Sequence, residues 1–93
     1  MEYQQFLKSL NNTEPPEGSL LLQAMWFDAK GDWDQAHRIV QDMDGASASW
    51  IHAYLHRKEG DLGNAGYWYH RAGRNRSEAD LSSEWEEIVK ALL

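Results

Sequence analysis

The sequence predicts an all-α domain made of antiparallel helical hairpins. Apolar residues recur at spacings of three and four along six segments, which is the periodicity of amphipathic helices. Two Gly-Asp pairs, at 31–32 and 60–61, each combine a residue that ends a helix with one that caps the next. No segment alternates apolar and polar residues for long enough to indicate a strand. Six helices with short loops are therefore expected, with neighbours antiparallel.

The chain has 93 residues, so we expect a single domain over residues 1–93. Hydrophobic residues make up 42% of it and aromatic residues 12%, including five Trp. That supply of large apolar side chains is sufficient for one compact core, which a disordered chain would lack. There is no Cys, which excludes disulfides and thiol chemistry.

The first half of the chain contains three of the expected helices. The helix at about residues 2–10 has one apolar face, made by Tyr3, Phe6, Leu7 and Leu10. A second helix runs from Leu20 to Lys30, and Gly31 ends it. Asp32 caps a third helix, with a buried stripe of Trp33, Ala36, Ile39, Val40 and Met43.

The second half contains the other three helices. A fourth helix, from about residue 49, buries Trp50, Ile51, Tyr54 and Leu55. Gly60 ends it and Asp61 caps the fifth, whose apolar residues are Ala65, Trp68, Tyr69 and Ala72. Ser77 is expected to cap a sixth helix over about 78–92, with Asp80 as its capping-box partner. We expect this helix to bury Leu81, Trp85, Ile88, Val89 and Leu92 and to expose Glu84, Glu86 and Glu87.

A short internal repeat links the two central hairpins, at about 20–43 and 49–73. Ala24, Gly31-Asp32 and Ala36 recur 29 residues later as Ala53, Gly60-Asp61 and Ala65. This block resembles the tetratricopeptide and Sel1-like repeat families. Their pattern is a small residue, a turn Gly, an Ala, an aromatic residue and a final Ala. The second copy matches it with Ala53, Gly60, Ala65, Tyr69 and Ala72.

The resemblance covers about residues 20 to 73 and implies a right-handed superhelix with a concave binding surface. The repeat is shorter than the usual length of about 34 residues, and there are two copies where about three are needed to cover a core. We therefore expect the helices at about 2–10 and 78–92 to cap the ends. A homodimer is the alternative way to cover them.

The resemblance also implies a ligand groove along the first helix of each hairpin. Its residues would be Trp50, Tyr54, Arg57 and Lys58 in the second hairpin, with Met25 and Asp28 at the matching positions of the first. An aromatic floor with a basic rim would suit an acidic peptide or a peptide carboxylate. Alternatively, Trp50 and Tyr54 belong to the core and the basic residues are solvated.

His52, His56 and Glu59 form a different candidate site on the fourth helix. Two His four residues apart on a helix can bind one metal ion, and Glu59 lies one turn further along. The metalloprotease motif needs Glu directly after the first His, where this chain has Ala53. The alternative is that both His are structural and pack half-buried against the fifth helix.

Charge and motifs narrow the class of function. The formal net charge of −6 disfavours binding to nucleic acid and to anionic membranes. The N-terminus lacks the pattern of a signal peptide, and no apolar run approaches the roughly 20 residues that cross a bilayer. We therefore expect a cytoplasmic protein.

Motifs for nucleophilic catalysis are missing, because the chain has no Cys and no Gly-x-Ser-x-Gly elbow. We therefore expect a non-catalytic module without a cofactor that binds a protein or peptide partner. A metal- or small-ligand-binding protein that uses His52 and His56, and a structural homodimer, are the alternatives.

Overall fold

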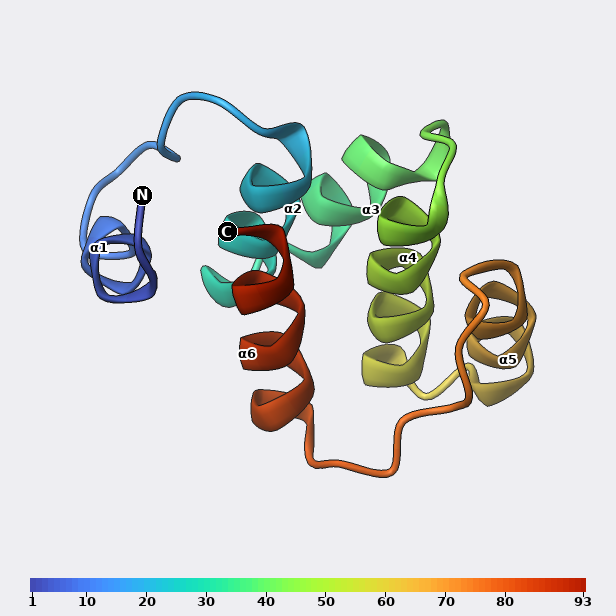
Figure 1. The fold of residues 1–93 in the computed structure, drawn as a ribbon. Coiled ribbons are helices and arrows are strands. Elements are labelled where there is room, and N and C mark those ends of the chain that lie inside the picture. The colour runs from blue at the N-terminus through green and yellow to red at the C-terminus, as the bar shows by residue number, and fades with distance from the viewer.

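The computed structural model describes all 93 residues and is all-helical, without strands (Figure 1). The expected all-α class is confirmed. No helix of the structure has both the length and the apolar character that a membrane span requires. The helices are α1 (Tyr3–Ser9), α2 (Leu20–Ala29), α3 (Trp33–Gln41), α4 (Ala46–Glu59), α5 (Leu62–Arg71) and α6 (Leu81–Leu92).

The turn between α2 and α3 has the geometry that its Gly-Asp pair predicts. Gly31 has φ +85°, a left-handed conformation that Gly adopts without strain. The Asp32 N–H donates to the Phe27 carbonyl at 2.9 Å, which closes the end of α2. The Asp32 carboxylate accepts from the Gln35 N–H and caps α3. Helix α3 therefore folds back directly on α2.

The turn between α4 and α5 repeats these contacts. Gly60 has φ +90°, and the Asp61 N–H donates to the His56 carbonyl at 2.9 Å. The Asp61 carboxylate caps α5 by accepting from the Asn64 N–H. Both predicted corners are thus confirmed.

Two helix starts differ from the sequence expectation. Helix α4 begins at Ala46, three residues earlier than expected, directly after Gly45 at φ +104°. Helix α6 begins at Leu81, and its N-cap is Asp80, not Ser77. The Asp80 carboxylate accepts from the Ser83 N–H at 2.7 Å, whereas the Ser77 hydroxyl accepts from Ala79 within the preceding loop. Asp is as good an N-cap residue as Ser, and Asp80 directly precedes Leu81, the first apolar residue of the helix.

Helix α4 is the centre of the molecule, because every residue from Ala48 to His56 is buried. It packs against α3 and α5, and also against α2 and α6. In Figure 1, α5 and α6 flank α4 on its two sides. The other large core side chains are Phe6, Met25, Trp26, Val40, Tyr69, Ile88 and Val89.

Helix α6 packs mainly against α2 and α4. Trp85 fixes this position, since its ring contacts the Phe6 ring at a centroid distance of 6.0 Å and its indole N–H donates to the Met25 carbonyl at 3.1 Å. Helix α1 in turn covers α2 and α6, where the Trp26 indole N–H donates to the Ser9 carbonyl. The two terminal helices thus cover the first helix of each hairpin.

Candidate metal centre

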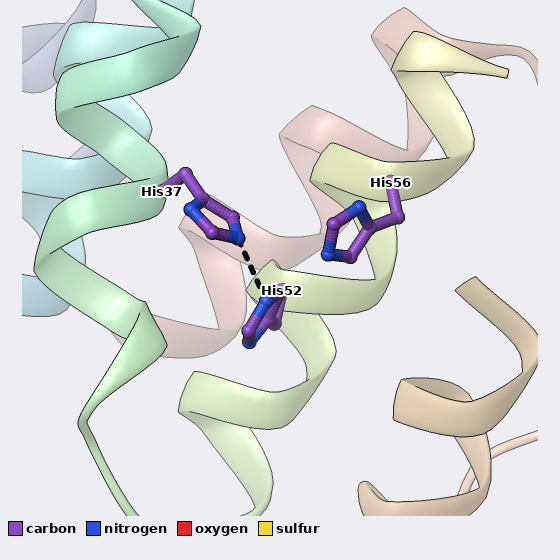
Figure 2. Close-up of side chains that lie close together, drawn as sticks. All are labelled: His37, His52 and His56. Atoms are coloured by element: carbon purple, nitrogen blue, oxygen red, sulfur yellow. Dashed lines mark hydrogen bonds between the residues drawn. The ribbon is translucent and has the colours of Figure 1, made fainter. Parts of the chain in front are cut away.

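Three His side chains from two helices converge beside α4 (Figure 2). His52 and His56 lie one turn apart on α4, as their spacing predicts. His37 comes from α3 and reaches them because α3 packs directly against α4. The cluster therefore joins the second helix of one hairpin to the first helix of the next.

The nitrogens of these rings lie at distances close to those of a metal site. The Nε2 atoms of His37 and His52 are 3.0 Å apart, and one ligand nitrogen from each of the three rings lies within 4.8 Å of the others. Two nitrogens bound to one tetrahedral zinc at about 2.0–2.1 Å lie roughly 3.3 Å apart. The His37–His52 pair is thus close to this spacing, and movement of the His56 ring toward the pair would complete three-nitrogen coordination.

Two Trp rings hold the cluster in place. Trp33 stacks on His37 at a centroid distance of 4.8 Å, and its indole N–H donates to the Leu55 carbonyl at 2.8 Å. Trp68 of α5 stacks on His52 at 3.9 Å. His52 and His56 are buried and His37 is half-buried, so solvent reaches the cluster beside His37.

Glu59 contacts only one of the three His residues. Its carboxylate lies 2.7 Å from His56 Nδ1, so the atom of that ring able to bind an ion is Nε2, which has one long contact of 3.4 Å with Asn64 Nδ2. A carboxylate on the outer nitrogen of a metal-binding His is the usual arrangement around zinc. The same region offers a second, more exposed group of potential ligands in His56, Glu59 and Asp61.

Burial keeps His37 and His52 uncharged. Burial first, and then the neighbouring His37 and His56, lower the pKa of His52 to about 4. Burial and then His56 also lower the pKa of His37, although Glu59 and Asp34 act in the opposite direction. His37 and His52 are therefore neutral near pH 7, which is the form that binds a metal.

The residues of the predicted groove lie on the other side of α4, beneath α6. Glu84 of α6 enters the groove, where its carboxylate lies 2.8 Å from Arg57 Nη1 and 3.2 Å from Trp50 Nε1. The Tyr69 hydroxyl lies 2.6 and 2.8 Å from its two oxygens. The guanidinium of Arg74 covers the Trp50 ring at 3.5 Å from its centroid.

The expectation that Glu84 faces solvent is wrong, since it is 1% exposed. Its position on α6 belongs to the buried face with Ile88, four residues later, and the Arg57 guanidinium compensates its charge. Glu86 and Glu87 are exposed, as expected.

The remaining groove residues form a second buried polar contact. Asp28 accepts from the Tyr54 hydroxyl at 3.1 Å and from Lys58 Nζ at 3.0 Å. Burial, with the charge of Asp28, raises the pKa of Tyr54, so it remains a neutral donor. Met25 lies in the core beneath Trp85.

Sequence reasoning missed His37 as a candidate ligand. A signal was present, because His37 lies four residues after Trp33 and therefore on the same face of α3 as that apolar residue. What could not be predicted was the rotation of α3 that points this face at His52 and His56.

Comparison of the chain with protein-family models, with curated proteins and with solved structures found no match.

Proposed function

We propose that this chain binds one first-row transition metal ion, of the zinc class, through His37, His52 and His56. The observation that supports it is the convergence of three imidazoles whose ligand nitrogens lie within 4.8 Å of one another. Imidazole is a preferred ligand of zinc and copper, and three protein ligands leave the fourth position free for water or another ligand.

The surroundings support the same proposal. The Glu59 carboxylate orients His56, and the Trp33 and Trp68 rings restrict the rotation of His37 and His52. Such fixed side chains lose little freedom when an ion binds. The bound ion would link α3 of the first hairpin to α4 of the second and so stabilise their packing.

Titration of the metal-free protein with zinc chloride in a calorimeter tests this function. We expect one zinc ion to bind per chain of the wild type. His37→Gln removes one of the three metal–nitrogen bonds, so we expect its affinity for zinc to be at least about tenfold lower. His70→Gln is the matched control, because His70 is exposed on α5 and outside the cluster. Equal binding by wild type and His37→Gln would contradict the proposal.

Binding of an acidic helical peptide is a second candidate function, favoured by the way α6 occupies the groove. Its Glu84 carboxylate contacts Arg57, Trp50 and Tyr69. A partner helix with a carboxylate at the matching position would have to displace α6 and make the contacts of Glu84 in its place. Fluorescence anisotropy with a labelled peptide of residues 80–93 tests this. We expect that peptide to bind and its Glu84→Lys form not to bind. Equal binding by both peptides would show that the groove is not the binding site.

A further inference from the structure

A cavity of about 350 Å³ opens where the first turn of α6 meets the C-terminal ends of α2 and α4. This volume is at the small end of the range for ligand pockets, about 300–1,000 Å³. Its lining combines the apolar side chains of Leu10, Ala29, Leu81 and Trp85 with the polar groups of Asp28, Tyr54, Lys58 and Ser82.

The charged residues in the lining are Asp28 and Lys58, which form an ion pair. Both carboxylate oxygens of Asp28 are engaged, one by Lys58 Nζ at 3.0 Å and the other by the Tyr54 hydroxyl at 3.1 Å. The Lys58 ammonium has three N–H groups, and Asp28 accepts from one of them. The Lys58 side chain is 38% exposed, so its remaining donors are accessible from the cavity mouth.

This arrangement disfavours charged ligands of both signs. An anion on Lys58 would lie close to the buried carboxylate of Asp28, where repulsion is weakly screened. A cation would be repelled by Lys58, whose ammonium lies 3.0 Å from Asp28 and already balances that carboxylate. A neutral molecule with one acceptor avoids both costs, because the ion pair already balances its own charge.

We propose that this cavity binds an uncharged, mainly apolar small molecule that carries one hydrogen-bond acceptor, such as a ketone. The acceptor would take a hydrogen bond from Lys58 Nζ, and the apolar part would lie between Leu81 and Trp85. This site shares no residue with the three-His cluster and does not depend on metal binding.

Heteronuclear NMR with three probes of matched length, methyl butyl ketone, hexanoate and hexylammonium, tests the proposal. The ketone is expected to shift the amides of Leu81 and Ser82 and the indole N–H of Trp85 saturably, with a Kd on the order of 1 mM. Hexanoate and hexylammonium are expected to bind at least about tenfold more weakly. Absence of a saturable shift at these groups, or hexanoate binding as tightly as the ketone, would overturn it.

Two variants identify the site within the cavity. Ala29 is exposed at the cavity edge, so Ala29→Met should fill the space without disturbing the core and weaken ketone binding by about tenfold. Ala91→Met, at an exposed position of α6 outside this cavity, is the control and should bind as the wild type does. Unchanged binding by Ala29→Met would overturn the assignment.

Asp28→Asn tests the charge argument with a substitution of nearly the same shape. It leaves Lys58 without a counter-charge, so hexanoate should bind about tenfold more tightly than it does to the wild type. If hexanoate affinity stays the same or falls in folded Asp28→Asn, the ion pair does not determine which ligand the cavity accepts.

Discussion

Two polar clusters, one around Glu84 and one formed by His37, His52 and His56, lie on opposite sides of α4. They differ in how many of their polar atoms have hydrogen-bond partners. The carboxylate of Glu84 has three protein donors around it, including a guanidinium, and offers no position to a ligand. In the His cluster, the Nε2 atoms of His37 and His52 bond only to each other. One of these two nitrogens carries the proton of that hydrogen bond. If this proton is instead carried by Nδ1 of the same ring, the Nε2 lone pairs of His37 and His52 are both free to bind an ion.

This difference assigns the two clusters different roles. A buried charge with complete partners fixes how two helices pack, and loss of one partner leaves the other uncompensated. The neutral imidazoles of His37 and His52 have no charge to balance, and each can offer a ring nitrogen to an ion. We infer that the Glu84 cluster stabilises the fold and that the His cluster serves binding, and the following predictions test this division.

The largest effect is expected from Glu84→Ala. It leaves the Arg57 guanidinium near the protein interior without its carboxylate, which should cost about 3–5 kcal/mol of unfolding free energy in urea denaturation. Glu87→Ala is the control, since its ion pair with Arg74 is exposed and should be worth less than about 1 kcal/mol. Equal losses in both variants would show that burial of Glu84 does not matter.

Acid should destabilise the metal-free protein through His52. Its pKa is about 4 in the folded chain and 6.5 in the unfolded chain, so the unfolded state takes up the proton first. Stability is therefore complete above pH 6.5 and falls as the pH drops toward 4, by on the order of 3 kcal/mol. His52→Gln should have a flatter pH profile over this range, measured by urea denaturation with a chelator present. The same slope in both proteins would contradict the burial of His52.

Zinc should stabilise the wild type by a similar amount. At a free concentration of about one hundred times Kd, binding to the folded state alone adds roughly 2.7 kcal/mol to the unfolding free energy. His70→Gln should gain the same stabilisation. His52→Gln, with at least about a tenfold weaker site, should gain no more than roughly 1.4 kcal/mol. Equal stabilisation of His52→Gln and the wild type would place the ion elsewhere.

The smallest contrast concerns single hydrogen bonds in the two clusters. Tyr69→Phe removes a hydroxyl that lies 2.6 Å from a buried charged oxygen and should cost about 2 kcal/mol. Asn64→Ala removes a long 3.4 Å contact to His56 and should cost less than about 0.5 kcal/mol. A larger loss from Asn64→Ala than from Tyr69→Phe would reverse the comparison between the clusters.

Local features of this chain could be predicted from the sequence, because they depend on neighbouring residues. The corners at Gly31 and Gly60 follow from a left-handed Gly next to a capping Asp. The pairing of His52 with His56 follows from helix geometry. Each of these needs information from only one or two turns of the chain.

Features that depend on packing between distant helices could not be predicted. Trp85 joins α6 to α1 and α2, and α6 also packs against α4, which places Glu84 in the core. Since a surface Glu is by far the commoner case, composition and periodicity assigned Glu84 to solvent. His37 was missed for the same reason, since its partners lie on another helix.

The most direct test of the central claim is NMR of the imidazole nitrogens of all four His residues during zinc titration. We predict that the Nε2 signals of His37, His52 and His56 shift together and reach their end point at one equivalent, while those of His70 do not move. A site that leaves any of the three unchanged, or that shifts His70 instead, would contradict a metal centre between α3 and α4.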